Sequence, residues 1–321
     1  LHRLIRRQRQ MCIRDSMNIV CAADSGYVQH CSVMLISFFE NNPGEEHAVY
    51  LLTEGLDLDD LDFIQKIVHS YNGHFFYCQV DFKFLEKCPI KSTDHLSIAT
   101  YNRLFMADLL PADVNKVLYL DCDIIVNQSI KELWETPLRD NFVVAAFEER
   151  GCCAEDVYER LDYDSKYGYF NAGVLLVNLD YWRTHNMTQA FIEYIEHNFE
   201  KLRAHDQDVL NAFFYDKSVH ISLAWNVEFI FYYYGIIKKF GFDRDLRFIL
   251  RHPKILHFTW KPKPWETSCQ HPFRINYYRY LKKIKKNPLS FRDTLRALWD
   301  KYYFCFLIKW KIKGHKYYKL V

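Results

Sequence analysis

Two aspartates separated by one residue follow an apolar run in the middle of the chain, at Asp121 and Asp123 within residues 116–126. In an extended strand the side chains alternate between faces, so these carboxylates are expected to point the same way, with Cα atoms about 6 to 7 Å apart. A hard divalent cation binds carboxylate oxygens and keeps positions open for phosphate oxygens. The pair therefore predicts a site for a metal-bound phosphate or diphosphate; the alternative is a strand end that uses Asp for turn chemistry.

The segments around this pair alternate between strand and helix patterns. Ahead of it, the patterns predict strands at 17–23, 47–53 and 74–80. They also predict three helices: one over 27–40, one over 99–110 that ends at Pro111, and one between them. The middle helix contains Leu61, Ile64, Val68 and Tyr71 at helical spacing and has a cap at Gly73. After it, they predict strands at 142–147, 173–179, 219–223 and 254–258, and helices at 188–199 and 208–214. The alternation predicts an α/β fold with a mostly parallel sheet and ligands at the carboxyl ends of its strands, where Asp24 also lies.

The first residues of the chain differ from the rest. Residues 1–16 contain five Arg and one Asp, show no helix or strand period and resemble a translated sequencing-adapter end. We therefore expect a non-native leader and a natural start at Met17. The whole chain has a net charge of +2, and residues 1–16 alone contribute +4. The remaining chain therefore has a net charge of −2. Without a basic excess no nucleic-acid partner is expected.

The remaining residues suffice for one large α/β domain. Half of the chain is hydrophobic (50%), which is enough for a full core. The ten Cys lack the spacing of a metal-binding set and predict reduced thiols in a cytosolic protein. No apolar run reaches the roughly 18 residues that a membrane-spanning helix needs.

The C-terminal residues 276–321 are rich in Lys and aromatic residues. Beyond Asp300 the sequence has six Lys and no acidic residue, around the aromatic stretch 302–308. A basic aromatic segment too short to span a bilayer predicts an interfacial anchor, so we expect a protein that lies peripherally on the inner face of the cell membrane. The alternative is a C-terminal helix docked on the preceding domain, with its Lys in water.

Six separated segments match one protein family in their order, their spacing and their residues. They are 22–27 (AADSGY), 103–105 (RLF), 118–123 (LYLDCD), 169–174 (YFNAGV), 205–210 (HDQDVL) and 257–265 (HFTWKPKPW). From Met17 to about Trp265 the chain thereby resembles glycosyltransferase family 8, bacterial galactosyl- and glucosyltransferases of lipopolysaccharide synthesis and their relatives. The resemblance implies a GT-A fold over 17–275, retention of anomeric configuration, UDP-galactose or UDP-glucose as donor, and a glycan or lipid-linked glycan of lipopolysaccharide or another cell-surface polysaccharide as acceptor.

The resemblance also implies a metal site. Asp121, Asp123 and His257 resemble the family's ligands for Mn²⁺, with Mg²⁺ as the alternative ion, and a nitrogen ligand favours Mn²⁺. Cys122 lies between the two carboxylates and is assigned to the same donor site. Lys263 matches the lysine that reaches the diphosphate, where an ammonium group stabilises the charge on departing UDP. Outside the motif, His257 would be an ordinary core or surface histidine and Lys263 a solvated loop lysine.

The first and second motifs imply the nucleoside site. Asp24 resembles the acid that hydrogen-bonds the uracil, and Tyr27 resembles the aromatic residue that stacks on it, with Ala22 leaving room beside them. Arg103 resembles an arginine that lies against the donor. From the residues alone, Asp24 would be a helix N-cap, Tyr27 a core residue and Arg103 a structural helix arginine.

Asn171, Asp206 and Gln207 correspond to family residues that bind the hydroxyl groups of the transferred sugar, and Asp206, Gln207 and Lys263 are the catalytic candidates. Gln207 matches the residue nearest the far face of the sugar. Because an amide is a poor nucleophile, the usual inference is departure and attack on the front face, guided by the leaving phosphate. From the residues alone, Asn171 would be a turn residue and Asp206 a helix cap.

Two residues depart from the family pattern. Trp260 stands where the family usually has a glycine that allows close backbone approach, which affects donor pocket shape or loop closure. Glu148 stands where many relatives have Asp near the sugar, and one additional methylene can alter which hexose fits. We interpret both as changes of specificity.

Two other functions compete with the transferase. A haloacid dehalogenase-type phosphatase also has an Asp-x-Asp strand end and uses the first carboxylate as nucleophile, but it places that motif on its first strand. Here at least three predicted strands precede it. A non-catalytic sugar-nucleotide-binding relative is the other alternative, and Trp260 is the residue that favours it.

Overall fold

The computed structural model of the chain describes residues 16–44, 46–81, 86, 88, 98–138, 144–146, 156–233, 244–266, 268–269, 271–284, 299, 303 and 306. The chain divides into two compact units, each made of segments that are far apart in sequence. Unit 1 contains residues 1–31, 42–122 and 131–221, and unit 2 contains residues 32–41, 123–130 and 222–321. The expected leader up to residue 15, Glu148 and most of the expected tail lie outside the described residues.

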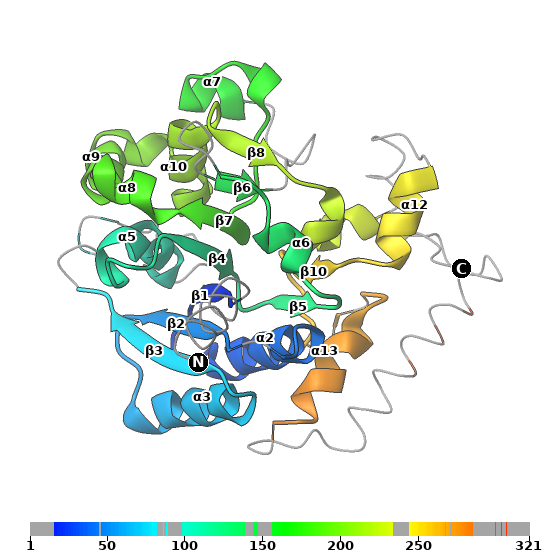
Figure 1. The fold of residues 1–321 in the computed structure, drawn as a ribbon. Helices are drawn as coiled ribbons and strands as arrows, with labels where there is room; N and C mark the ends of the chain where they lie inside the picture. Colours follow the sequence, from blue (N-terminus) through cyan, green and yellow to red (C-terminus); the bar gives the residue numbers. More distant parts are fainter. Residues whose placement is uncertain are drawn as a thin grey trace, which may run out of the picture. The chain divides into compact units, whose positions relative to one another are not determined.

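Unit 1 is built on a seven-stranded sheet with the order β3-β2-β1-β4-β7-β6-β8 (Figure 1). Its strands are β1 (Asn18–Ala22), β2 (Ala48–Thr53), β3 (His74–Gln79), β4 (Lys116–Leu120), β6 (Val144–Ala146), β7 (Val174–Asn178) and β8 (Ser218–His220). β1 pairs in parallel with β2 and β4, as do β2 with β3 and β6 with β8, whereas β7 is antiparallel to β4 and β6. The predicted α/β fold with a mostly parallel sheet is confirmed.

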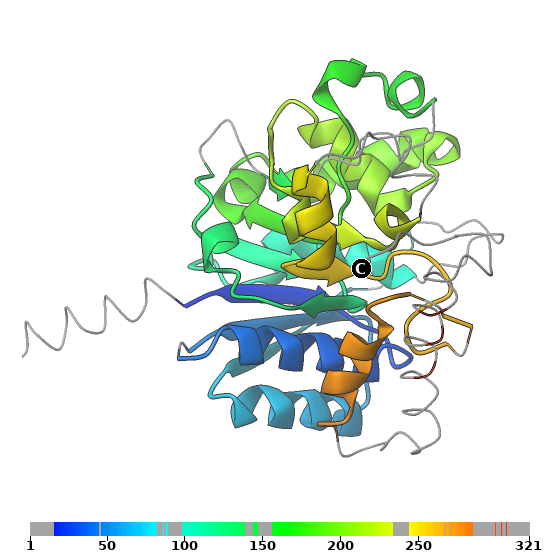
Figure 2. The same cartoon turned by 90° about the vertical axis from the view of Figure 1, so that its right-hand side faces the viewer.

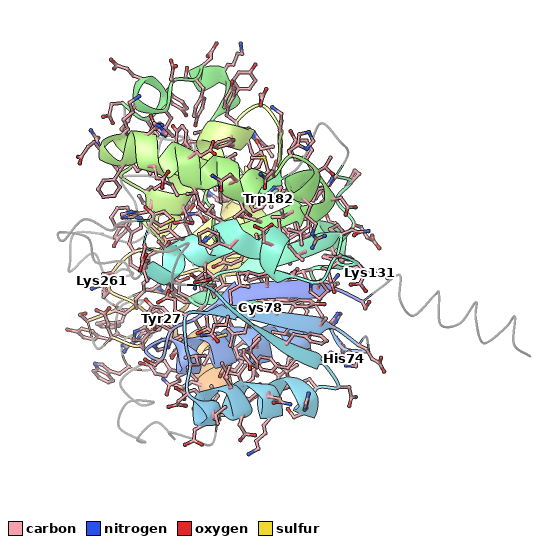
Figure 3. The ribbon with its side chains drawn as sticks, turned by 90° about the vertical axis from the view of Figure 1, so that its left-hand side faces the viewer. Tyr27, His74, Cys78, Lys131, Trp182 and Lys261 are labelled. Carbon is pink, nitrogen blue, oxygen red and sulfur yellow. The ribbon has the colours of Figure 1, made fainter. Side chains whose placement is uncertain are left out.

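One face of this sheet carries the main hydrophobic core of unit 1. Because side chains alternate along a strand, each central strand contributes one row to this core, including Val20, Leu52, Tyr119 and Val177. Trp182 is completely buried among them (Figure 3). The segments that supply the other side of the core are η1 (Ile98–Phe105), α5 (Met106–Leu109), α8 (Leu179–Thr184), α9 (Met187–Asn198) and α10 (His205–Phe214). Further short helices of unit 1 are α6 (Lys131–Trp134), α7 (Val157–Leu161), η2 (Ser165–Tyr167) and η3 (Phe199–Lys201).

The helix α3 (Leu58–Ser70) packs beside β3 and ends in a Schellman motif. Gly73 N–H donates to Val68 O and Asn72 N–H donates to His69 O, each at 3.0 Å. Asn72 has a φ of +59° and so takes the left-handed position, which asparagine tolerates better than most residues. The predicted cap is therefore present, but the left-handed residue is Asn72 and Gly73 follows it.

Unit 2 has a small sheet in the order β5-β10-β9, in which β10 is antiparallel to β5 and parallel to β9. Asn41, at the end of α2, donates through Nδ2 to Val126 O and to the Tyr280 hydroxyl, both at 3.0 Å. These bonds connect α2 to β5 and α13 (Figure 2). The elements are α2 (Val28–Asn41, whose first turn belongs to unit 1), β5 (Ile124–Val126), η4 (Leu223–Trp225), β9 (Val227–Glu228), η5 (Phe229–Tyr232), α12 (Arg244–Arg251), β10 (Ile255–His257) and α13 (Arg274–Leu281).

The Asp pair does not lie on one extended strand, so this prediction was wrong. β4 ends at Leu120, residues 121–123 form a turn, and β5 begins at Ile124 as part of another sheet. The apolar run at 116–126 reads as continuous because both strands are buried. Burial on both faces removes the alternation that would have revealed the break.

The helix predicted over 99–110 is also different. Residues 98–105 form the 3₁₀ helix η1 and only Met106–Leu109 are α-helical, before Pro111. In a 3₁₀ helix residues three apart are aligned, and Thr100 and Arg103 accordingly both contact Asp206. The tighter winding thus places two polar side chains of a buried segment on one partner.

Membrane-spanning segments were expected to be absent. Among the described residues, none of the helices combines the length and the apolar character that crossing a bilayer requires.

Candidate functional site

The turn after β4 presents the Asp-x-Asp pair. Asp121 N–H donates to Gly173 O at 2.9 Å, which holds the turn against the start of β7. The Tyr119 hydroxyl, two residues earlier on β4, donates to Asp121 Oδ1 at 3.1 Å. On the other side of the turn, Asp123 O accepts from Phe258 N at 3.0 Å. Both ends of the turn are thus fixed by strand neighbours, which limits where the two carboxylates can point.

Arg103 is the centre of the polar cluster in unit 1. Its side chain is buried; NH2 is 2.9 Å from Asp121 Oδ1, Nε is 2.8 Å from Asp206 Oδ2, and NH1 donates to Ala172 O. The guanidinium also lies over the Tyr119 ring, 4.4 Å from its centroid. Burial alone would lower the pKa of Arg103, but Asp121 and Asp206 raise it above its ordinary value. Arg103 therefore remains a cation that joins the metal-site carboxylate to α10.

Asp206 is a buried carboxyl group with two partners. Burial raises its pKa, and the nearby Arg103 and the hydrogen bond from Thr100 Oγ1 at 2.6 Å lower it only in part. The sequence alone suggested a helix cap for Asp206, and the structure does not bear this out, because the N-cap of α10 is Ala204. Asp206 instead faces Arg103 from inside the first turn.

Gln207 and Asn171 bind each other at the start of β7. Gln207 Oε1 accepts from Asn171 Nδ2 at 3.2 Å and from Ala172 N at 3.0 Å. Asn171 Oδ1 accepts from Gly173 N at 2.9 Å, so the turn role suggested by the sequence is also present. The two amide side chains are thereby held in fixed orientations beside the Arg103 cluster.

The first turn of α10 is itself under constraint. His205 is buried and adopts a φ of +47°, which is unusual for a residue with a side chain, and its Nδ1 lies 3.1 Å from the Tyr101 hydroxyl. Asp208 is completely buried and accepts from Arg203 N, Ala204 N and Arg160 NH1. These contacts define where α10 begins and hence where its two site residues project.

Unit 2 supplies the second polar cluster, around Asp123. His257 Nε2 is 3.2 Å from Asp123 Oδ1, and Lys263 Nζ is 2.5 Å from Asp123 Oδ2. His257 Nδ1 lies 2.9 Å from Asn226 Oδ1, an acceptor, which directs the Nδ1 proton to Asn226 and Nε2 towards Asp123. Burial would raise the pKa of Asp123, but Lys263 and His257 outweigh it and the pKa is lowered. Asp123 is therefore an anion.

Lys263 is held by its own loop. Its ammonium group also donates to Phe258 O at 2.7 Å and to Thr259 O at 2.6 Å, so its three protons have three acceptors. Between these anchors the loop carries Trp260, which is 65% exposed. The loop therefore fixes the lysine and presents a large ring to solvent.

Asp121, Asp123 and His257 form a group with the donor chemistry of a divalent metal site. Each offers one ligand atom, and these atoms all lie within 4.8 Å of one another. Carboxylate oxygens and a neutral imidazole nitrogen are ligands for first-row divalent ions, so the residues present fit such an ion. The sequence-predicted ligand set is thus brought together.

The residues predicted for a nucleoside lie at the end of β1 and the start of α2. Ala22 ends β1, and Asp24 Oδ1 accepts from Tyr27 N at 3.1 Å, so Asp24 also stabilises the start of the helix. The Tyr27 ring packs edge-on against His30. Figure 3 shows Tyr27 towards the end of the unit 1 sheet at which β3 carries Cys78, away from the end with His74. This is the carboxyl end of the parallel strands.

Glu54 was missed by the sequence reasoning. It follows β2 and accepts a long hydrogen bond from Asn102 Nδ2, at 3.5 Å. Burial raises its pKa, and the nearby Asp24 carboxylate raises it further. Its place at the carboxyl end of the strand next to β1 could have identified it, because parallel strands bring these ends together.

Cys122 uses its thiol within the protein. Its thiol is buried and donates to Ala22 O at 3.1 Å. Cys21 and Cys31 lie close to one another, with their sulfur atoms 3.6 Å apart. These three side chains pack β1, α2 and the end of β4 together, and all three are free cysteines in the described part of the chain.

Comparisons with known proteins identify similar sequences. Residues 18–269 match the model of glycosyl transferase family 8. General stress protein A of Bacillus subtilis is 28% identical over 281 residues, 86% of this chain and 96% of that protein. The lipopolysaccharide 1,3-galactosyltransferase of Salmonella typhimurium is 26% identical over 289 residues, 86% of this chain and 80% of that protein.

The fold is similar to solved structures as well. The crystal structure of the galactosyltransferase LgtC in complex with donor and acceptor sugar analogues matches with a TM-score of 0.73 and 26% identity, covering 87% of this chain and all (100%) of that one. The predicted GT-A fold is confirmed by this match. Because the family model covers most of the sequence, the chain belongs to glycosyl transferase family 8.

Proposed function

We propose that the protein is a Mn²⁺-dependent, retaining hexosyltransferase that moves galactose or glucose from a UDP-sugar to a glycan acceptor. The observation that carries this proposal is the group of Asp121, Asp123 and His257, within a chain of family 8. Its nitrogen ligand favours Mn²⁺ over Mg²⁺, which prefers oxygen. When bound, the ion would neutralise the diphosphate and stabilise the charge on departing UDP.

Lys263 shares this task in the proposal. Its ammonium group is held by Asp123 and two main-chain carbonyls, and a cation fixed in this way stabilises developing charge without having to reorganise. On the other carboxylate, Arg103 and Tyr119 orient Asp121. The chain itself therefore supplies positive charge on both sides of the Asp-x-Asp turn.

Asp206, Gln207 and Asn171 are proposed to bind the transferred hexose. Gln207 Oε1 already accepts two hydrogen bonds, from Asn171 Nδ2 and Ala172 N, so its lone pairs are engaged. An amide oxygen in this state is a poor nucleophile. This supports attack by the acceptor on the face from which UDP departs, which retains the anomeric configuration.

The nucleoside is proposed to lie against the start of α2. Asp24 uses Oδ1 for the Tyr27 N–H, which leaves Oδ2 as an acceptor for a uracil N–H. The Tyr27 ring is only half-buried and offers a face for stacking, beside Ala22. Cys122 is proposed to contact the donor through its main chain, since its thiol is used by Ala22 O.

The acceptor is proposed to be a glycan or lipid-linked glycan at the cytoplasmic face of the membrane. The support is the related Salmonella protein, a lipopolysaccharide 1,3-galactosyltransferase. We propose that residues 276–321 hold the protein peripherally on this surface. Among the described residues there, Trp299, Tyr303 and Phe306 are 65%, 43% and 51% exposed, and their spacing gives one helical face.

A donor panel tests the proposed chemistry. Purified protein is incubated with UDP-galactose, UDP-glucose and UDP-N-acetylglucosamine, with Mn²⁺, with Mg²⁺ or with a chelator, and released UDP is measured. We expect slow hydrolysis of one UDP-hexose, strongest with Mn²⁺ and absent with the chelator. Absence of UDP release with every donor, together with tight binding of UDP, would favour the non-catalytic alternative that Trp260 keeps open.

Asp123→Asn tests the metal ligand. The amide keeps an oxygen for Lys263, so the fold and the melting temperature should be preserved, while UDP release falls by at least about 100-fold. The same sample should leave more free Mn²⁺ in an electron paramagnetic resonance titration. Asp180→Asn, at an exposed position of α8, is the matched control and should behave like the parent. Full turnover in Asp123→Asn would refute the assignment.

The phosphatase alternative is not supported. Among the described residues three strands, β1 to β3, precede the β4 strand that leads into the Asp-x-Asp turn, and the family match covers residues 18–269. A phosphatase would release phosphate from small phosphomonoesters, which the same samples can report.

A further inference from the structure

The helix α12 (Arg244–Arg251) presents a large apolar ring among basic residues to solvent. Phe248 is 66% exposed, and Arg247, Arg251 and His252 are exposed as well. In a helix, residues at i, i+1, i+4 and i+5 share one side, so these four form a single face. The His252 ring packs against Phe248 with centroids 4.8 Å apart, which holds the phenyl ring on that face.

The opposite side of α12 attaches it to unit 2. Leu250 is completely buried, and its carbonyl accepts from the Tyr232 hydroxyl at 3.2 Å. Lys254, which follows the helix, lies over the Trp225 ring at 4.0 Å. The exposed face therefore belongs to a helix that is fixed along its other side, and Figure 2 shows α12 beside β10 within this unit.

We propose that this face of α12 binds an anionic lipid surface, with Phe248 entering the headgroup region and Arg247 and Arg251 contacting lipid phosphates. Charge complementarity supports this occupant, because α12 has three Arg against one Asp in sequence. Moving a phenyl ring that is two-thirds exposed out of water lowers the free energy of the system, which favours binding. A helix of this composition lies in the interface plane and does not span it.

Other occupants fit this face less well. A second copy docking through the same face would bring Arg247 and Arg251 close to their symmetry mates, and like charges oppose such contacts. Nucleic acid would engage the arginines but would leave the phenyl ring without a partner. A lipid headgroup layer is the surface that accepts both the positive charges and the ring.

The contact is separate from the proposed C-terminal anchor and from the donor chemistry. α12 lies outside residues 276–321, and none of its residues belongs to the groups around Asp121 or Asp123. Lipid binding and UDP release are therefore independent measurements. Failure of one leaves the other unaffected.

Sedimentation with vesicles tests the proposal. The full chain is titrated with phosphatidylcholine vesicles that contain a quarter phosphatidylglycerol, and with pure phosphatidylcholine. We expect Phe248→Ser to weaken binding to the anionic vesicles by about tenfold, because the variant has no phenyl ring to transfer from water into the headgroup region. Arg251→Glu should weaken it by about five- to tenfold and reduce its salt dependence.

Matched controls are available on other helices. Leu58→Ser removes a side chain that is 83% exposed on α3, and Lys201→Glu reverses an exposed charge on η3, outside residues 276–321. Both should bind the vesicles within twofold of the parent, and all four variants should keep the parent's melting temperature and UDP release. Unchanged affinity in Phe248→Ser and Arg251→Glu would overturn the proposal. So would equal parent affinity for neutral and anionic vesicles, or light scattering that shows a dimer lost only in Phe248→Ser.

Discussion

Two positive charges compete for the Asp123 carboxylate: the Lys263 ammonium group and the proposed divalent ion. This carboxylate is paired with Lys263 at 2.5 Å and faces His257 at 3.2 Å, and it belongs to the group that fits a divalent ion. A divalent ion bound to Asp123 would lie close to the Lys263 ammonium group, and both are positively charged. Repulsion from Lys263 would therefore weaken the binding of an ion, and the diphosphate of the proposed donor would offset both positive charges.

Lys263→Met separates these effects. Removing the ammonium group should tighten binding of Mn²⁺ in the absence of nucleotide by about tenfold, because one repulsive charge is lost near Asp123. UDP release from the preferred donor should fall by about 100-fold, because the fixed cation no longer stabilises the leaving group. Calorimetric titration with Mn²⁺ and the UDP assay report the two quantities.

Lys261→Met is the control for this prediction. Lys261 lies in the same loop and is exposed (Figure 3), so its removal should leave both quantities near the parent values. Weaker Mn²⁺ binding in Lys263→Met would show that the lysine supports the ligand group and does not compete with it.

Individual site residues were predictable where chemistry is local in sequence. The Asp-x-Asp pair, Lys263 and His257 were identified from their motifs, and three of them are now seen in contact. The link from Arg103 to both Asp121 and Asp206 could not be predicted, because it joins segments up to about a hundred residues apart through buried charges. Which carboxylates pair with a buried arginine depends on which other groups are buried beside it, and that is decided by the fold.

At the level of elements, the start of α10 positions the site. Residues 206 and 207 project from its first turn, and Asp208 fixes that turn by accepting from Arg203 N and Ala204 N and by pairing with Arg160 at 2.6 Å. A carboxylate at a helix N-terminus also interacts favourably with the helix dipole. The positions of the two residues that we propose to bind the hexose thus depend on the buried Asp208, which is not one of the proposed site residues.

Asp208→Ala should be strongly destabilising. It leaves Arg160, itself mostly buried, without its carboxylate and leaves two main-chain N–H groups without acceptors. Breaking a buried pair in this way costs about 3 to 5 kcal/mol in the free energy of unfolding. Urea denaturation measures this loss. Asp216→Ala, whose exposed partner is Lys217 beyond the other end of α10, should change the stability by less than about 0.5 kcal/mol. A loss below about 1 kcal/mol for Asp208→Ala would contradict the prediction.

Elements with a clear period were predicted to within a few residues, and the others were not. β1, β2, β3 and α9 match their expected ranges because apolar patterns and flanking breakers mark them. The break between β4 and β5 was hidden because both strands are buried, and α12 was missed because its pattern is mostly polar. Short strands such as β9 depend on their partners and leave almost no sequence pattern.

At the scale of the whole molecule, stability also depends on a buried ionisable group that is not one of the site residues. His271 is buried in unit 2 among Phe229, Tyr232 and Phe258, and its Nδ1 accepts from Phe273 N at 3.1 Å. Burial lowers the pKa of His271 to about 3. The folded protein therefore keeps this imidazole neutral at neutral and mildly acidic pH, which composition and motifs did not predict.

This buried imidazole should make the protein lose stability in mild acid. In the unfolded chain a histidine binds a proton below about pH 6.5, whereas folded His271 does so only below about pH 3, so between these values protons favour unfolding. From pH 6.5 to pH 5 the free energy of unfolding should fall by about 1.6 kcal/mol more in the parent than in His271→Asn. The asparagine keeps an oxygen for Phe273 N, and other titrating groups are common to both proteins and cancel in the difference. Urea denaturation at several pH values measures it.

The control for this comparison is His197→Asn, at an exposed position of α9. Because this variant leaves the buried His271 in place, it should follow the parent's pH dependence. Removing His271 lowers the stability at neutral pH as well, since a large ring is replaced by a smaller side chain in a packed core. The diagnostic quantity is therefore the slope against pH and not the absolute value. Equal slopes for the parent and His271→Asn would mean that the imidazole gains a proton without unfolding the core of unit 2.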